Sequence, residues 1–240
     1  MNWDIVADNY HSLVGEKGDF HHRTFLNPVI LKFLGQVKGK KVIDLACGQG
    51  YFSRLLAKKG AIVTGIDTSE RLIGLAKDNS GKQTMIKYFV SDSAKMKQIS
   101  DSSQDIIVSN MAFHDIKNIA GTIRECQRIL KKKGSLIFSI PHPLRNLGEK
   151  GKDKGGYFWK MRHYGLNRIA PNKLYAKQGI VAYHRSLDCY LNLLLVNSFI
   201  ITGFKEIYTT SNKPDRIKDQ KYLKFKQEIP SFVVVKGIRT

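Results

Sequence analysis

Cysteine is scarce in this sequence, with three residues among 240. Cys47, Cys126 and Cys189 are an odd number, and their spacings match neither a zinc site nor a disulfide framework. Such cysteine usage suits a reducing compartment. We therefore expect no structural metal and no disulfide scaffold.

The sequence also lacks a long uninterrupted hydrophobic run. Its most apolar late stretch, LNLLLVNSFIITGF at 191–204, is broken by Asn192, Asn197 and Ser198. The first ten residues carry two acids and no basic residue, unlike the charged start of a signal peptide. These absences predict a soluble, cytoplasmic protein that is not attached to a membrane.

Acidic residues are outnumbered, with 20 Asp and Glu against 40 Lys and Arg. Residues 1–120 hold 12 acids and 16 bases, whereas residues 121–240 hold 8 and 24. An excess in one half is typical of a chain that meets nucleic acid, an anionic surface or an anionic small substrate. Scattered lysines also keep many proteins in solution, so charge alone leaves the partner open.

What the sequence has in abundance is an alternation of short β-rich runs and helical patterns between residues 41 and 140. This alternation predicts an α/β doubly wound Rossmann-like sandwich, with a mostly parallel sheet covered by helices on both faces. We expect one domain, with a helical N-terminal cover at 1–37 and a core at 38–143 and 185–240. The glycine-rich and aromatic stretch 144–184 is predicted to be an inserted cap after the fifth strand, over the edge where such sheets bind ligands.

The stretch VIDLACGQG, residues 42–50, joins a buried strand to a tight glycine turn. A dinucleotide fingerprint requires a third glycine, which would fall at Ser53. It also places a pyrophosphate at the helix N-terminus, where the carboxylate of Asp44 would repel it. The α-ammonium of S-adenosylmethionine would be attracted by that acid, and Gly48 and Gly50 would let the backbone approach the rest of the molecule. The pattern favours this cofactor.

Two further acids follow the next strands. Asp67 in GIDTS can accept hydrogen bonds from both ribose hydroxyls, and Asp92 in VSDSA can accept one from the adenine amine. Each acid alone could be a helix cap or a solvated turn. Together with Asp44 they indicate a nucleoside site.

These residues carry a family resemblance. VIDLACGQGYFSRLLAKKGAIVTGIDTSERLIGLAK, VSDSA, DIIVSNMAFHDI and ILKKKGSLIFSIPHP resemble the motifs of class I S-adenosylmethionine-dependent methyltransferases, over residues 38–143. The resemblance implies a seven-stranded sheet with one antiparallel strand and release of S-adenosylhomocysteine. It also implies cofactor contacts at Tyr10, Asp44, Ala46, Gly48, Gly50, Asp67, Thr68, Leu72, Asp92, Ser93, Asn110 and Met111.

Two acceptor classes are disfavoured by missing motifs. Enzymes that methylate amines of nucleic-acid bases resemble one another in an Asn/Asp-Pro-Pro-aromatic run, where this chain reads SNMA. Cytosine C5 enzymes resemble one another in a cysteine nucleophile preceded by proline, and no cysteine here follows one.

A general base, where the acceptor needs one, is expected among histidines near the predicted mouth, because their ordinary pKa lies near neutrality. His142, between two prolines after the fifth strand, is the candidate catalytic residue. His114, Trp159 and His184 are candidate substrate residues.

We expect a methyltransferase that acts on oxygen, nitrogen or carbon of a small organic acceptor, and the basic second half is compatible with an anionic one. Methylation of tRNA or rRNA is the alternative, because lysines and arginines alternate with aromatics in 144–184. A protein that binds the cofactor without catalysis is a further alternative.

Overall fold

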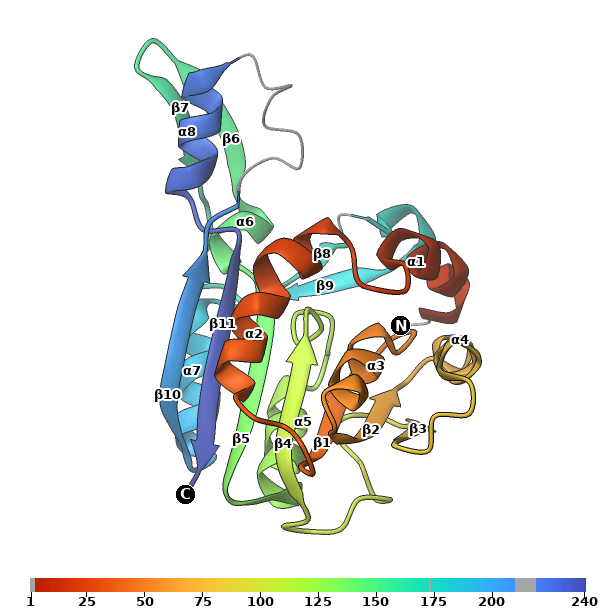
Figure 1. The fold of residues 1–240 in the computed structure, drawn as a ribbon. Helices are drawn as coiled ribbons and strands as arrows, with labels where there is room; N and C mark the ends of the chain where they lie inside the picture. Colours follow the sequence, from red (N-terminus) through yellow and green to blue (C-terminus); the bar gives the residue numbers. More distant parts are fainter. Residues whose placement is uncertain (1–2, 173, 210–218) are drawn as a thin grey trace.

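The computed structural model describes residues 3–172, 174–209 and 219–240 (Figure 1). The helical elements are η1 (Trp3–Val6), α1 (Ala7–Val14), η2 (His22–Leu26), α2 (Asn27–Leu34), α3 (Tyr51–Lys58), α4 (Glu70–Ser80), α5 (Ile119–Ile129), α6 (Pro143–Leu147), η3 (Ala176–Gln178), α7 (Leu187–Val196) and α8 (Gln220–Glu228). The strands are β1 (Lys41–Leu45), β2 (Ile62–Asp67), β3 (Ile86–Val90), β4 (Gln104–Asn110), β5 (Leu130–Pro141), β6 (Glu149–Asp153), β7 (Gly156–Lys160), β8 (Arg168–Pro171), β9 (Val181–His184), β10 (Phe199–Ile207) and β11 (Phe232–Arg239).

Seven strands form one sheet in the order β10-β11-β5-β4-β1-β2-β3. Neighbouring strands from β5 to β3 are parallel, whereas β11 runs antiparallel to both β5 and β10. The strand order reverses between β1 and β4, which creates the crevice where open α/β sheets bind ligands. This confirms the expected doubly wound sheet with one antiparallel strand.

Hydrophobic side chains alternate between the two faces of the sheet. Val42 packs in the core that includes α2 and α3, and the next residue, Ile43, packs in the core that includes α5 and α7. Because successive side chains of a strand point to opposite faces, apolar residues at consecutive positions require helices on both sides. The consecutive buried residues of β1 and β4 therefore explain why helices cover both faces of the sheet.

The inserted stretch 144–184 does not form one cap. Its first part, the β6-β7 hairpin, packs against α8 and projects beyond the sheet at the upper left of Figure 1. Its second part, the β8-β9 hairpin, lies near α1 over the end of β4. The glycine-rich hairpin departs from the predicted cap, because its aromatics Tyr157 and Trp159 pack on Phe225 of α8. A cap formed by 168–184 stays a prediction.

No helix within the described part of the chain combines the length and apolar character needed to cross a membrane.

Candidate active site

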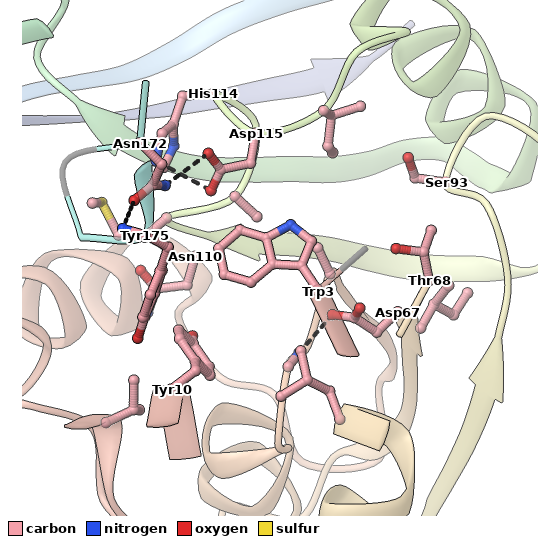
Figure 2. A pocket seen from close by; sticks show the side chains of 18 of the residues that line it. Trp3, Tyr10, Asp67, Thr68, Ser93, Asn110, His114, Asp115, Asn172 and Tyr175 are labelled. Carbon is pink, nitrogen blue, oxygen red and sulfur yellow. Dashed lines mark hydrogen bonds and ion pairs between the residues drawn. The ribbon is translucent and has the colours of Figure 1, made fainter. Parts of the chain in front are cut away.

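A cavity of about 510 Å³, here called the first cavity, opens at the carboxyl ends of β1, β2 and β4. Its floor comes from the turns that follow these strands, and its roof comes from η1, α1 and the β8-β9 hairpin (Figure 2). Parallel strands present their carboxyl ends at the same edge, which brings residues distant in sequence into one site.

The glycine turn after β1 is tied to the end of β2. Gly48 N donates a hydrogen bond of 2.8 Å to Asp67 Oδ2, and Ser69 N donates one of 3.0 Å to Asp67 Oδ1. Burial raises the pKa of Asp67 above its ordinary value, and the two backbone bonds oppose that rise. Each carboxylate oxygen keeps a second acceptor position, so Asp67 can also accept from a ligand in the first cavity.

Two residues of the cavity wall other than glycine have left-handed backbone conformations, Ala46 with φ of 55° and Met111 with φ of 60°. Such conformations are uncommon outside glycine and are found preferentially at functional sites. Both residues follow the carboxyl end of a strand, where the chain must turn sharply to leave room for a ligand.

Most of the predicted cofactor residues line the first cavity. They are Tyr10, Ala46, Gly48, Asp67, Thr68, Leu72, Asp92, Ser93, Asn110 and Met111. Asp44 and Gly50 do not line it, and the structure gives each of them another partner.

Asp44 is buried beneath the turn, where Ser53 Oγ donates a hydrogen bond of 2.6 Å to its Oδ2. Burial raises the pKa of Asp44 to about 7, and the Ser53 hydroxyl limits the rise. The expected direct contact with the cofactor ammonium is not supported, because the Asp44 side chain does not line the first cavity and instead holds the first turn of α3.

Gly50 has φ of 79° and precedes α3. A side chain at this position would begin 2.5 Å from Tyr88 Oη and 3.0 Å from Ala76 Cβ. The second glycine of the motif is therefore required by packing of β3 and α4 against the turn, and not by close approach of a ligand as expected.

The roof of the cavity is an aromatic cluster that joins two distant segments. The ring of Trp3 lies 6.0 Å from that of Tyr10 and 5.9 Å from that of Tyr175, both edge to face. Figure 2 shows the indole between these tyrosines and Asp67. Asp4 Oδ1 accepts from Ser69 Oγ at 2.5 Å, which holds this N-terminal segment on α4.

The loop between β4 and α5 carries a histidine and an acid at the other end of the cavity. His114 Nε2 lies 3.4 Å from Asp115 Oδ2, and Asn172 Nδ2 lies 3.5 Å from Asp115 Oδ1 (Figure 2). Burial raises the pKa of Asp115, and the charge of His114 opposes the rise. His114 Nδ1 is buried without a hydrogen-bond partner among the described residues.

Arg185 fixes the position of this loop. Its guanidinium donates to the carbonyls of Phe113 at 3.4 Å, Ile116 at 2.8 Å and Lys117 at 2.9 Å. Tyr183 N donates to His114 O at 2.7 Å. The end of the cap and the catalytic edge of the sheet are thus built as one unit.

His142 is not at the cavity. It is 3% exposed, its Nε2 lies 3.0 Å from Glu206 Oε1, and its Nδ1 accepts from Leu144 N at 3.3 Å. Both ring nitrogens are engaged, and His142 caps the N-terminus of α6. The prediction of His142 as the base is therefore wrong for a physical reason: its lone pair is already used.

The other two predicted substrate residues also lie outside the first cavity. Trp159 Nε1 donates to Leu144 O at 2.7 Å, in the projecting β6-β7 hairpin. His184 is 1% exposed and lines a neighbouring cavity, described below. Of the three, only His114 lines the first cavity.

Several residues of the first cavity were not anticipated from the sequence: Trp3, Asp19, Asp115, Asn172, Tyr175 and Tyr183. Asp115 follows His114 directly, and this pairing was the one local signal available. The others come from the N-terminal segment and the cap, whose positions depend on how these segments fold over the sheet.

Comparison with known proteins agrees with this architecture. The family model described as "Methyltransferase domain" matches residues 43–138. The crystal structure of an S-adenosylmethionine-dependent methyltransferase from Mesorhizobium loti superposes with a TM-score of 0.76 at 27% identity, covering 88% of this chain and 96% of that one. Residues 43–138 thus match a methyltransferase domain, and the chain has the fold of S-adenosylmethionine-dependent methyltransferases.

Two curated relatives are similar to parts of this methyltransferase. It is 29% identical over 193 residues to an uncharacterised protein of Haemophilus influenzae, an alignment that covers 75% of this chain and 74% of the relative. It is 35% identical over 140 residues to a ubiquinone biosynthesis O-methyltransferase of Coxiella burnetii, covering 56% of this chain and 57% of that protein. The methyltransferase thus spans little more than half the length of the second relative.

Proposed function

We propose that this methyltransferase transfers a methyl group to an oxygen of a small organic acceptor, with His114 as the general base. The observation that carries the proposal is the placement of His114 and Asp115 at the wall of the first cavity, opposite the glycine turn and Asp67. The O-methyltransferase named among the relatives supports oxygen as the attacked atom.

The residues present fit the cofactor. Asp67, Thr68 and Asp92 give one end of the cavity the acceptors that a ribose and an adenine need. Tyr175 Oη is buried with no hydrogen-bond partner among the described residues and lines the same space, so a polar ligand would satisfy it. A side chain at Gly48 would begin 3.1 Å from Tyr10 Cε1 at a backbone φ of 55°, so glycine suits this tightly packed turn.

When bound, S-adenosylmethionine supplies a methyl group on a sulfonium, which an acceptor lone pair takes as the carbon–sulfur bond breaks and its electrons return to sulfur. The chain's own task is to align the acceptor, exclude water and remove its proton. The proton passes to His114 Nδ1, which has no hydrogen-bond partner among the described residues, while Nε2 lies 3.4 Å from the carboxylate of Asp115, which stabilises the imidazolium that forms.

A hydroxyl acceptor explains why a base is needed. A neutral alcohol or phenol is a weak nucleophile until its proton is removed, whereas many amines attack through a lone pair that is already available. The buried pair of His114 and Asp115 therefore favours oxygen over nitrogen.

The test is transfer of labelled methyl from S-adenosylmethionine to a panel of phenols and hydroxy acids, with their methyl ethers as blocked controls. His114→Gln should lower kcat by about 10²-fold or more, in line with the contribution of a general base, while S-adenosylhomocysteine affinity stays within a few-fold. His163→Gln is the matched control, because His163 is exposed and lines neither cavity. Full activity of His114→Gln, or equal labelling of the blocked ethers, would contradict the proposal.

A further inference from the structure

A second cavity of about 360 Å³ adjoins the first. The two share Met111, His114, Asn172 and Leu174 in their walls, so they meet at the proposed base. The rest of the second cavity lies between the carboxyl end of β5, the start of β11 and the β8-β9 hairpin. A molecule in the second cavity would thus reach His114 from the side opposite Asp67.

The two cavities differ in charge. Asp19, Asp67, Asp92 and Asp115 line the first, with Lys117 as its one lysine or arginine among the described residues. That excess of acid suits a ligand with an ammonium and a sulfonium.

The second cavity has the reverse character. Arg145 and Lys226 line it together with His21, His114 and His184, and no acid in the described part of the chain lines it. A cavity with cations and no carboxylate attracts an anionic ligand and disfavours a cationic one.

Arg145 is held firmly at the wall. Its Nε donates to Pro230 O at 3.1 Å, and its Nη2 donates to Ile229 O at 2.7 Å and to Lys226 O at 3.5 Å. These carbonyls at the end of α8 orient the guanidinium, whose Cζ also lies 5.3 Å from the centroid of the Trp159 ring. A cation fixed before the ligand arrives loses little side-chain freedom on binding.

His184 supplies an independent observation. Its Nε2 lies 2.9 Å from Tyr164 O, a carbonyl that can only accept, so this nitrogen carries hydrogen. Its Nδ1 is buried and has no hydrogen-bond partner among the described residues, although the side chain lines the second cavity. A buried polar atom without a partner is costly, and a hydroxyl or other hydrogen-bond donor of a bound molecule would satisfy this acceptor.

Apart from Asn172, Thr209 and Ser231, the remaining wall is apolar. Met111, Pro141, Pro171 and Phe232 contribute most of it, together with alanines of the β8-β9 hairpin. Such a lining fits a hydrocarbon or aromatic body between the polar ends of the ligand.

We propose that the acceptor is a small hydroxylated molecule with an apolar body and an anionic group, a carboxylate or a phosphate. Its anion lies in the second cavity against Arg145 and Lys226, and its hydroxyl lies at His114. This inference rests on the proposed function, since it assigns the acceptor of that same reaction.

The experiment uses the full chain loaded with S-adenosylhomocysteine, whose binding is measured first. Calorimetry then compares three probes of similar shape: hydroxyphenylacetate, hydroxyphenyl phosphate and the neutral hydroxyphenylethanol. The two anions should bind at least about tenfold more tightly than the neutral probe, a difference typical of a well-placed charge, and the tighter anion identifies the acidic group.

Lys226 carries the mutational test, because replacing Arg145 would also remove three hydrogen bonds at the end of α8. Lys226→Glu should weaken anion binding at least about tenfold and leave binding of the neutral probe and of S-adenosylhomocysteine unchanged. Lys224→Glu is the control, since Lys224 is exposed on the same helix and does not line the cavity.

Equal binding of charged and neutral probes, no binding of either anion, or equal effects of the Lys226 and Lys224 variants would overturn the anion site and leave the proposed function standing. Saturable methylation of bulk tRNA or rRNA that persists near physiological salt would overturn the small acceptor. Failure of S-adenosylhomocysteine to bind would overturn both proposals.

Discussion

The amide of Gly48 donates a hydrogen bond of 2.8 Å to Oδ2 of Asp67, across 19 positions of sequence. This bond ties the turn after β1 to the end of β2, the two places where the cofactor motifs lie. Asp67 therefore shapes the turn, and we predict that it also accepts a hydrogen bond from the cofactor.

Asp67→Ala should weaken S-adenosylhomocysteine binding by about 1–3 kcal/mol and also lower the free energy of unfolding, because Gly48 N and Ser69 N lose their acceptor. Calorimetry and denaturant unfolding measure the two effects. Asp78→Ala, exposed on α4, is the control and should change neither. Unchanged affinity in Asp67→Ala would remove this residue from the cofactor site.

Asp44 predicts a pH dependence of stability. Burial raises its pKa to about 7 in the folded protein, whereas an unfolded chain has an Asp pKa of about 4. The folded state therefore holds the proton more tightly, and the stability that this provides is complete below about pH 4 and lost as the pH rises to about 7.

Asp44→Asn stays neutral throughout this range and can still accept from Ser53 Oγ. Its unfolding free energy relative to the wild type should rise between about pH 4 and pH 7, by at most about 4 kcal/mol. Asp67 is present in both proteins, so its titration largely cancels in the difference. Parallel stability curves for the two proteins would refute the assignment.

Trp3 should report cofactor binding by fluorescence. The chain has two tryptophans, and Trp3 lines the first cavity while Trp159 packs in the projecting hairpin. Trp159→Phe should keep a saturable change of emission when S-adenosylhomocysteine is added, and Trp3→Phe should lose it. A signal that follows Trp159 instead would place the ligand elsewhere.

Gly50 and Gly74 form a matched pair for a packing test. Gly50→Ala should destabilise the fold by about 1–3 kcal/mol, because it crowds Tyr88 and Ala76 at a left-handed position. Gly74 lies inside α4 with nothing within 4 Å of an added Cβ, so Gly74→Ala should stabilise by about 0.5–1 kcal/mol. Thermal unfolding distinguishes the two variants by their melting temperatures. Equal shifts in melting temperature would show that the neighbours of Gly50 can move to accommodate a methyl group without loss of stability.

The sequence by itself determined the sheet, its helical layers and the cofactor. Hydrophobic periodicity, strand-end acids and glycine turns are local signals, because the backbone geometry that requires them spans a few residues. Ten of the twelve cofactor residues that the family resemblance implies line the first cavity. The two exceptions, Asp44 and Gly50, belong to the glycine motif but contact the protein interior: Asp44 binds Ser53, and Gly50 packs against Tyr88 and Ala76.

Only the tertiary structure decided which histidine faces the cavity and which part of 144–184 covers it. His142 and His114 both follow strands at the same edge, yet Glu206 of β10 engages the first while the cap and Asp115 surround the second. Trp159 packs against α8, a helix some 60 residues later in the sequence, and therefore lies outside the first cavity. The position of each of these side chains depends on partners that are distant in the sequence. Local sequence patterns do not reveal such partners, because they come together only when the chain is packed in three dimensions.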